Sequence, residues 1–474
     1  MRSFKNTLVG LSIFWLAACD SAWFGRALPF PTPAQHDLVV LATTGPLTHS
    51  EDDSDPASGL EHDLIEAFAR ELGVGVKYLI AEPTEIAARM AAGEAHIAIG
   101  WLSLPDDAAQ RVTPPLLHSH DVLVQNTAAP PITATTDLDG RSVHALSASR
   151  QLATLKKLQQ SVPGLKVIEE KEGDIFDLLD TVDSTPSHLA AIDSSLVDIA
   201  SQFTPSLQTT LDLSADTPIV WWLGRKPNTE LLARVCGFVE QAQLDGTMAR
   251  LEDRYYGHVR RLKQPDIIKF LGRTESMLPK LRHHFQAGQS IAGIDWRLLA
   301  AVAYQESQWE AEATSPTGVR GIMMLTEETA DRLGVSNRLD PRESILAGAR
   351  YLTLLKDQVT PQIAEPDRTW LALAAYNIGP GHFNVARNLA RQLGADPGIW
   401  FDMKRILPLL AQPKYYRRLK SGRARGGEAV ILVENIRSYY DILVRNEESF
   451  QPISPRLGRM IGLPTPRSGP RIRP

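Results

Sequence analysis

The chain has 474 residues, of which 43% are hydrophobic, and its 50 Lys and Arg against 55 Asp and Glu give a formal net charge of −5. This length and composition predict two or three globular domains. The charge balance argues against a nucleic-acid-binding protein, because such proteins carry a concentrated excess of positive charge.

The first residues predict export. Residues 1–18 contain the cations Arg2 and Lys5, followed by the apolar run Leu8–Ala18. This run is too short to span a bilayer and is typical of a signal peptide.

A lipid anchor is predicted at the end of this segment. Leu16-Ala17-Ala18-Cys19 resembles the lipobox of bacterial lipoproteins, which implies cleavage before Cys19 and lipidation of it, with residues 19–37 as anchor and linker. A plain signal peptide is the alternative. The expected location is the periplasmic face of the outer membrane, but Asp20 resembles the residue that retains lipoproteins in the inner membrane, so that membrane remains open.

No disulfide is expected. The chain has two cysteines, and if Cys19 carries lipid then Cys236 has no partner. Residues 231–240 look helical, so we expect Cys236 to be a small buried apolar residue. An exported chain without a disulfide depends on the size of its hydrophobic core.

Residues 38–257 alternate apolar strands with helices. We expect strands at 38–42, 76–80 and 95–100, and helices at 63–72 and 85–92. Strands that alternate with helices of this length predict an α/β domain with a parallel type of sheet.

Two segments of this region carry a family resemblance. Gly59–Leu64 and Leu244–Leu251 resemble the extracellular solute-binding proteins of family 3. The resemblance implies a periplasmic-binding-protein-like domain, with two lobes and a ligand cleft between them. We expect the chain to cross between the lobes near Val122–Gln125 and again near Ile219–Leu223.

The same resemblance implies a ligand, either a small amino-acid-like molecule or a muropeptide. Relatives that bind amino acids use an arginine shortly after the strand at 95–100 and an aspartate in the second lobe, and Arg111 and Asp193 are the nearest matches. From the residues alone, surface or capping roles remain the alternative for both. We expect the domain to regulate or position the catalytic part of the chain.

The histidine pairs do not predict a metal site. His118-x-His120 and His283-His284 lack further ligands at metal-binding spacing, such as a helical His-x-x-x-His with an acid. We therefore expect neither a metal nor a cofactor.

A single glutamate ends an apolar helix in the last third of the chain. Asp295 is a suitable N-cap, and the residues from there to Glu306 include neither Gly nor Pro. Leu299, Val302 and Glu306 share one helical face, so Glu306 lies on an apolar stripe. A carboxyl group there loses solvation, which raises its pKa and suits it to act as a general acid. A structural glutamate bonded to a backbone amide remains the alternative.

Three motifs extend this pattern. Glu306–Trp309, the segment 313–325 with Gly321, and Ala375–Gly381 resemble, in order and spacing, the lytic transglycosylases with a goose-lysozyme-like catalytic domain. The resemblance implies a mainly α-helical lysozyme-like domain at 265–450 that acts on peptidoglycan glycan strands. It implies that Glu306 is the catalytic residue and that Gly321 belongs to a loop walling the cleft.

The resemblance also implies substrate-binding residues, namely Ser307, Met324, Tyr376, Asn377 and Glu428. Met324 stands where most relatives have Gln, and Leu432 where the family pattern has Tyr. The Met-Met sequence resembles the membrane-bound murein transglycosylase F subfamily. From the residues alone, Tyr376 could equally be a core aromatic and Asn377 a helix end.

The implied reaction is that of a lyase. Ordinary glycosidases use two carboxylates, whereas the motifs contain Glu306 without a second acid in the partner role. In the family's reaction the glutamate protonates the oxygen leaving N-acetylmuramic acid and then deprotonates the muramoyl 6-hydroxyl, which closes a 1,6-anhydro ring. A hydrolytic lysozyme-type muramidase and a non-enzymatic envelope solute sensor remain as alternatives.

Residues 451–474 predict a basic tail. They are rich in Pro, Gly and Arg and contain no acidic residue. This composition predicts disorder, and both a solubilising role and contact with anionic lipid or cell wall fit its charge.

Overall fold

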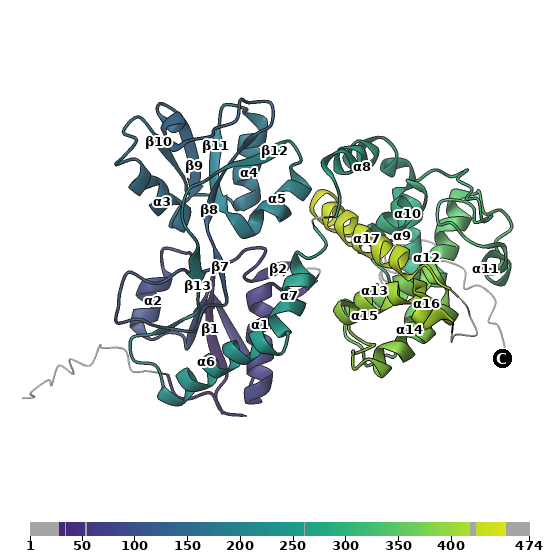
Figure 1. Ribbon diagram of the computed structural model, residues 1–474, viewed down its shortest axis with the longest axis horizontal. Coiled ribbons are helices and arrows are strands. Elements are labelled where there is room, and N and C mark those ends of the chain that lie inside the picture. Colours follow the sequence, from purple (N-terminus) through teal and green to yellow (C-terminus); the bar gives the residue numbers. More distant parts are fainter. Residues whose placement is uncertain (1–27, 34, 53–54, 260, 418–422, 452–474) are drawn as a thin grey trace, which may run out of the picture.

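The computed structural model describes residues 28–33, 35–52, 55–259, 261–417 and 423–451. Two α/β lobes lie on one side of the molecule and a helical part on the other (Figure 1). The predicted signal peptide, Cys19, Asp20 and residues 452–474 of the predicted tail lie outside the described residues. Within the described ranges, no helix is long and apolar enough to cross a membrane.

The first lobe is a five-stranded sheet in the order β4-β1-β5-β14-β6. In β1, Val40 and Ala42 face α1 and α6, whereas Leu41 packs on the opposite face with α2, as the period of two in a strand requires. The pairings of β1 with β4 and β5 are parallel, as predicted. The elements are β1 (Leu38–Ala42), β2 (Ser50–Asp52), β3 (Asp55–Ser58), α1 (Leu60–Leu72), β4 (Val76–Ile80), α2 (Ile86–Ala92), β5 (Ile97–Ile99), β6 (Arg111–Val112), β14 (Trp222–Gly224), α6 (Thr229–Leu244) and α7 (Thr247–Tyr255).

The second lobe repeats this plan with the strand order β10-β9-β11-β8-β12. α3 packs on one face of the sheet, and α4 and α5 pack on the other. β9 is parallel to β10 and β11, whereas β8 is antiparallel to both of its neighbours. The elements are β8 (Asp121–Asn126), η1 (Thr135–Leu138), β9 (Ser142–Leu146), α3 (Arg150–Leu158), β10 (Lys166–Glu170), α4 (Ile175–Ser184), β11 (Leu189–Asp193), η2 (Ser194–Leu196), α5 (Val197–Phe203) and β12 (Leu207–Asp212).

The chain crosses between the lobes along a two-stranded ribbon. β7 (Leu117–Ser119) pairs antiparallel with β13 (Thr217–Ile219). The predicted first crossing at Val122–Gln125 is wrong, because these residues form the buried middle of β8 inside the second lobe. Their apolar run belongs to a strand covered on both faces. The predicted second crossing at Ile219–Leu223 begins where β13 ends.

Cys236 departs slightly from its prediction. It lies in α6 and forms no disulfide within the described residues, and it is half-buried where full burial was predicted. Its side chain packs at the border of the first-lobe core. The helical pattern predicts on which face of the helix Cys236 lies, but it does not predict how much of that face neighbouring elements cover.

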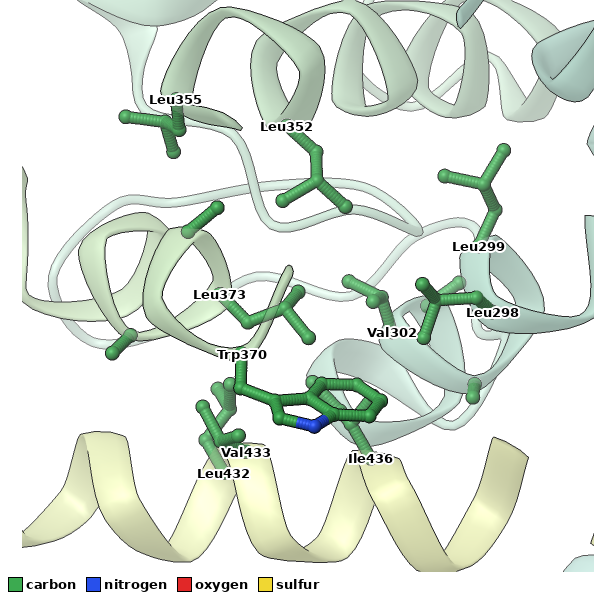
Figure 2. Packing of buried hydrophobic residues seen from close by; sticks show 14 of the residues in the cluster. Leu298, Leu299, Val302, Leu352, Leu355, Trp370, Leu373, Leu432, Val433 and Ile436 are labelled. Carbon is green, nitrogen blue, oxygen red and sulfur yellow. The ribbon is translucent and has the colours of Figure 1, made fainter. Parts of the chain in front are cut away.

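The helical part packs around α10, which crosses its centre. Figure 2 shows side chains from α10, α12, α13 and α17 meeting in one core, and a fully buried side chain of this kind contributes about 1.5–3 kcal/mol. The residues labelled there are Leu298, Leu299, Val302, Leu352, Leu355, Trp370, Leu373, Leu432, Val433 and Ile436. The elements are α8 (Gln264–Ser276), α9 (Leu278–Ala292), α10 (Trp296–Ser307), α11 (Glu327–Arg332), α12 (Pro341–Gln358), α13 (Asp367–Ile378), α14 (Pro380–Gln392), α15 (Trp400–Ile406), η3 (Leu407–Ala411), α16 (Pro413–Tyr416) and α17 (Gly426–Asn446).

One face of α17 contacts the α/β lobes through a buried charged network. The Arg437 side chain pairs with Glu434 at 2.9 Å and donates hydrogen bonds to the carbonyl oxygens of Asp253 and Arg254 at 2.8 and 2.9 Å. Lys404 bonds to the carboxylate of Asp253 from the other side. These contacts of the buried Arg437 hold α7 against α17. Removing one partner would be costly, because it would leave a buried charge without compensation.

Further contacts extend this interface along α17. His258 Nε2 lies 2.6 Å from an Asp441 carboxylate oxygen, and Gln202 Nε2 donates a hydrogen bond to the carbonyl oxygen of Ser438 at 2.7 Å. The Arg445 guanidinium lies 4.1 Å from the centroid of the Phe176 ring. The contacts therefore reach from the linker at His258 to the second lobe.

Candidate functional site

Glu306 lies one residue before the end of α10. Asp295 caps this helix as predicted, because its carboxylate accepts a hydrogen bond from the Arg297 amide at 2.8 Å. Glu306 is half-buried, and loss of solvation raises the pKa of its carboxyl group to about 8. In the part of the chain that the structure describes, no group donates a hydrogen bond to this carboxyl. A group with this pKa is largely protonated at neutral pH.

Glu61 in α1 is a contrasting buried glutamate. Burial raises the pKa of its carboxyl group to about 7, although three hydrogen bonds act against the shift. They come from the amides of Gly100 and Trp101 at 3.1 and 2.8 Å and from Trp221 Nε1 at 3.1 Å. A structural role, the alternative considered for Glu306, therefore describes Glu61, which lies in the segment Gly59–Leu64 that resembles family 3.

Ser307 ties the end of α10 to the glycine-containing segment. Its buried hydroxyl lies 3.0 Å from the carbonyl oxygen of Ala303 and 2.8 Å from that of Ile322. The two residues that follow, Gln308 and Trp309, have φ values of 54° and 66°. Two consecutive left-handed residues without glycine are strained, and such strain is found mostly at functional sites.

The segment 321–326 is a tight turn that only glycine can begin. Gly321 has a φ of 81°, and a Cβ there would lie 1.8 Å from the carbonyl oxygen of Arg338. The Met323 amide donates a hydrogen bond to Ser344 Oγ at 3.2 Å, and the Met323 side chain packs against Gly348. Met324 has a φ of 46° and is half-buried. The turn thus brings its backbone into contact with Ser307.

Tyr376 in α13 joins the same group of residues. Its hydroxyl donates a hydrogen bond to the carbonyl oxygen of Met323 at 2.7 Å. Burial, and then the charge of Glu306, raise the pKa of the phenol well above its ordinary value, so the two side chains lie near one another. Ser307, Met323 and Tyr376 therefore form a connected wall beside Glu306.

Two predicted site residues lie outside this wall. Asn377 is exposed one residue before the end of α13, where Gly379 caps the helix. Glu428 is exposed in the first turn of α17 and lies 3.5 Å from the Arg425 side chain. Leu432, at the family's tyrosine position, packs in the core.

The two residues predicted for the ligand of the α/β lobes lie in different lobes. Arg111 is exposed on β6 of the first lobe. Asp193 is buried at the end of β11, where its carboxylate pairs with Arg150 Nη2 at 2.6 Å and accepts hydrogen bonds from the amide and hydroxyl of Ser195 at 2.8 and 2.6 Å. Arg150 also pairs with Asp121 at 2.9 Å. Arg150 was not predicted as a site residue, and its position after the helix cap Ser149 is the one local signal.

Two family models match the chain. The Transglycosylase SLT domain matches residues 283–397, and Bacterial extracellular solute-binding proteins, family 3, matches residues 38–258. Among solved structures, an ancestral arginine-binding protein bound to arginine is 19% identical, with a TM-score of 0.42, and covers 46% of this chain and 98% of its own.

Curated relatives match both parts together. The membrane-bound lytic murein transglycosylase F of Nitrosospira multiformis is 40% identical over 95% of this chain and 94% of its own length. That of Thiobacillus denitrificans is 41% identical over 96% of both chains. At this identity and coverage, the chain belongs to the membrane-bound lytic murein transglycosylase F family.

Proposed function

We propose that the chain, a lytic murein transglycosylase, cleaves the β-1,4 bond between N-acetylmuramic acid and N-acetylglucosamine and leaves a 1,6-anhydro-N-acetylmuramic acid end. The observation that carries the proposal is Glu306, a desolvated carboxyl group with a pKa of about 8 and no internal hydrogen bond among the described residues. A proton held there at neutral pH is available to a leaving oxygen. The matching relatives bear the name of this activity.

In the proposed first step, Glu306 gives its proton to the glycosidic oxygen and the C1–O bond breaks. The acetamido oxygen of N-acetylmuramic acid supports the positive charge that develops at C1. The Glu306 carboxylate then takes the proton of the 6-hydroxyl, and O6 bonds to C1. One C–O bond breaks, one forms, and no water is consumed, so a single acid suffices where hydrolases use two.

The surrounding residues have proposed positioning and binding roles. Tyr376 fixes the turn at Met323 through its hydrogen bond, and Ser307 fixes the same turn from α10. Met324, Asn377 and Glu428 are proposed to contact the sugars. Asn377 and Glu428 are exposed, so their side chains are available for this contact. A water-excluded wall on one side of Glu306 favours the neutral acid before reaction.

The α/β lobes are proposed to position or regulate the helical part, with a small amino-acid-like molecule or a muropeptide as ligand. Arg437 of α17 binds a backbone carbonyl of α7, and His258 of the linker binds Asp441 of α17. These contacts support mechanical coupling between α7, the linker and α17. We further propose that the lipidated Cys19 holds the chain at the periplasmic face of the outer membrane.

Digestion of purified peptidoglycan tests the proposed reaction. Mass spectrometry of the released muropeptides should find anhydro ends, each lighter by one water than the product of hydrolysis. Products with reducing ends throughout would instead make the chain a lysozyme-type muramidase, and no release by the folded full chain would favour a non-enzymatic sensor.

A further inference from the structure

The chain just after Glu306 is held in a strained backbone conformation. Gln308 and Trp309 have φ values of 54° and 66°, in the left-handed region that favours glycine. Gln308 also ends α10, where its amide donates a hydrogen bond to the carbonyl oxygen of Tyr304 at 2.7 Å. Two left-handed residues in succession persist only where the surrounding structure fixes them. The groups that fix this pair therefore also fix the last turn of α10, which carries Glu306.

The indole of Trp309 is one of the groups that fix this pair. The residue is only 1% exposed, and its Nε1 donates a hydrogen bond to the carbonyl oxygen of Ala300 at 2.8 Å. Its ring packs against Phe270 of α8 and Tyr304 of α10, with ring centroids 5.6 and 5.0 Å away. Trp309 is therefore fixed both by the helix that it follows and by α8.

The helix α8 supplies a second contact through Arg273. Its guanidinium donates a hydrogen bond to the carbonyl oxygen of Gln308 and pairs with a Glu310 carboxylate oxygen at 2.9 Å. The Glu310 side chain is 54% exposed, so this ion pair is screened by solvent and contributes little. The bond to Gln308 reaches a backbone carbonyl at the end of a helix, where carbonyl groups lack partners within the helix. Arg273 thereby holds the backbone of the first strained residue.

Arg273 acts on Glu306 from outside the motifs of the helical part. None of these motifs includes α8, because all of them begin at Glu306 or later. Arg273 reaches Glu306 through the backbone of Gln308, which lies two residues further along the chain. The pKa of Glu306 is raised by loss of solvation and not by a neighbouring charge. What α8 can affect is therefore the position and the burial of the Glu306 carboxyl group.

We propose that Arg273 is a positioning residue for the cleavage reaction, which through the carbonyl of Gln308 keeps the last turn of α10 wound and the Glu306 carboxyl group out of water. Without this contact, Gln308 and Trp309 relax toward ordinary backbone angles and the last turn of α10 loosens. Water then reaches the carboxyl group, which no longer holds its proton at neutral pH. The inference rests on the proposed function and adds a residue to the same site.

Arg273→Ala in the full chain tests the proposal, with Arg368→Ala as a matched control. Arg368 of α13 also donates to a backbone carbonyl, that of Lys356 at 3.0 Å, and also pairs with a carboxylate, that of Asp357 at 3.4 Å. The two arginine side chains are 23% and 22% exposed. Both variants should therefore lower the thermal midpoint to a similar extent. Only Arg273→Ala should lower kcat for peptidoglycan cleavage, by about tenfold to a hundredfold, with KM little changed.

The pH dependence of kcat/KM separates positioning from two simpler effects. Cleavage by a general acid with a pKa of about 8 falls as the pH rises through that value. If Arg273→Ala lets water reach Glu306, the pKa moves toward its ordinary 4.5, and the fall should begin about one pH unit lower or more. Loss of a nearby positive charge would by itself raise this pKa, and a merely weaker fold would leave it unchanged. Tyr376 beside Glu306 does not titrate in this range, because burial raises its pKa.

An NMR titration of isotope-labelled side-chain carboxyl groups measures the same pKa without turnover, with Glu306→Gln identifying the signal. Arg273→Met keeps the apolar stem of the side chain and removes the guanidinium, so it should give the same lowered pKa and kcat even if Arg273→Ala does not fold. An unchanged or raised pKa of Glu306 in a folded Arg273 variant, or an equal loss of kcat in Arg368→Ala, would overturn the proposal. A wild type that cleaves nothing would instead refute the proposed function, and the NMR titration would still decide the role of Arg273.

Discussion

Glu306 and Glu61 both have a pKa raised by loss of solvation, but they differ in what surrounds the carboxyl group. Glu61 is bound by two amides and an indole, which orient it permanently. Glu306 has only the loss of solvent, and its pKa of about 8 is the higher of the two. A residue kept unsatisfied in this way is costly for the fold, so its retention is best explained by a task that needs a mobile proton.

Replacing Glu306 by Gln should abolish glycan cleavage. The swap preserves size and removes the transferable proton, so we expect a loss of roughly a thousandfold or more in kcat, since general acid catalysis alone contributes about 10²–10⁴-fold. Release of muropeptides from purified peptidoglycan measures it, and Glu310→Gln, an exposed glutamate beyond α10, is the control. Activity within tenfold of the wild type would remove Glu306 from the central role.

The same substitution should stabilise the fold at high pH. A carboxyl group whose folded pKa lies above its ordinary 4.5 contributes stability that is present below that value and lost as the pH rises through about 8. Gln escapes this loss, so the difference in the free energy of unfolding between Glu306→Gln and the wild type should widen in favour of the variant between pH 5 and pH 9, by roughly 1–4 kcal/mol. Urea unfolding at the two pH values measures it. A difference that does not change with pH would mean that solvent reaches the carboxyl group.

Local patterns predicted some of these residues and not others. The Asp295 cap and the apolar stripe predicted the helix that carries Glu306, because both are local features of one helix. The pairing of Arg150 with Asp193, and the bonds of Glu61 to Gly100, join residues far apart in the chain. Such contacts depend on the tertiary fold, and one sequence carries no local sign of them.

At the scale of elements, the reacting end of α10 is shaped by a turn from another part of the chain. Ser307 and Tyr376 both hold the backbone at 322–323. The family resemblance implied only that Gly321 belongs to a loop walling the cleft, and the structure shows why glycine is needed there, since the carbonyl of Arg338 occupies the place of a side chain. It did not predict the left-handed backbone at Gln308, Trp309 and Met324, because no glycine marks those positions.

Gly321→Ala should therefore be far more harmful than Gly318→Ala. Both glycines have a positive φ, of 81° and 83°, so both substitutions carry the same backbone strain of about 1 kcal/mol. A Cβ at Gly318 meets nothing within 4 Å, whereas one at Gly321 meets the Arg338 carbonyl oxygen at 1.8 Å. We expect Gly321→Ala to lower the thermal midpoint and the cleavage rate strongly, and Gly318→Ala to do so slightly. Equal effects in thermal denaturation and digestion would show that the turn adjusts freely.

At the scale of the molecule, α17 serves both parts at once. Its Leu432, Val433 and Ile436 face the helical core (Figure 2), while Arg437 and Asp441 bind α7 and the linker. The sequence predicted the two folds and their order, because each has its own motifs. It could not predict this interface, since the residues that form it are charged and polar and look like an ordinary solvated helix face.

The last prediction concerns the independence of the helical part, for which we propose the limits 265–450. Its core is continuous without the lobes, and removing the lobes leaves Arg437 paired with Glu434. The C-terminal limit matters as well, because Trp296 Nε1 donates to the carbonyl oxygen of Glu448 at 3.2 Å and Gln289 to that of Phe450 at 2.8 Å.

We expect the fragment 265–450 to fold and to cleave peptidoglycan, and a fragment ending at 446 to lose roughly 1–3 kcal/mol of stability or more, because it forfeits both hydrogen bonds and the ion pair of Glu447 with Arg282. Urea unfolding and digestion of both fragments, compared with the full chain, measure the two effects. Because both fragments lack the lobes, a difference between them reports the loss of residues 447–450 alone. A folded but inert 265–450 fragment would mean that the lobes supply part of the active site. In that case the contacts of Arg437 and His258 would be needed for the chemistry itself, beyond any role in positioning.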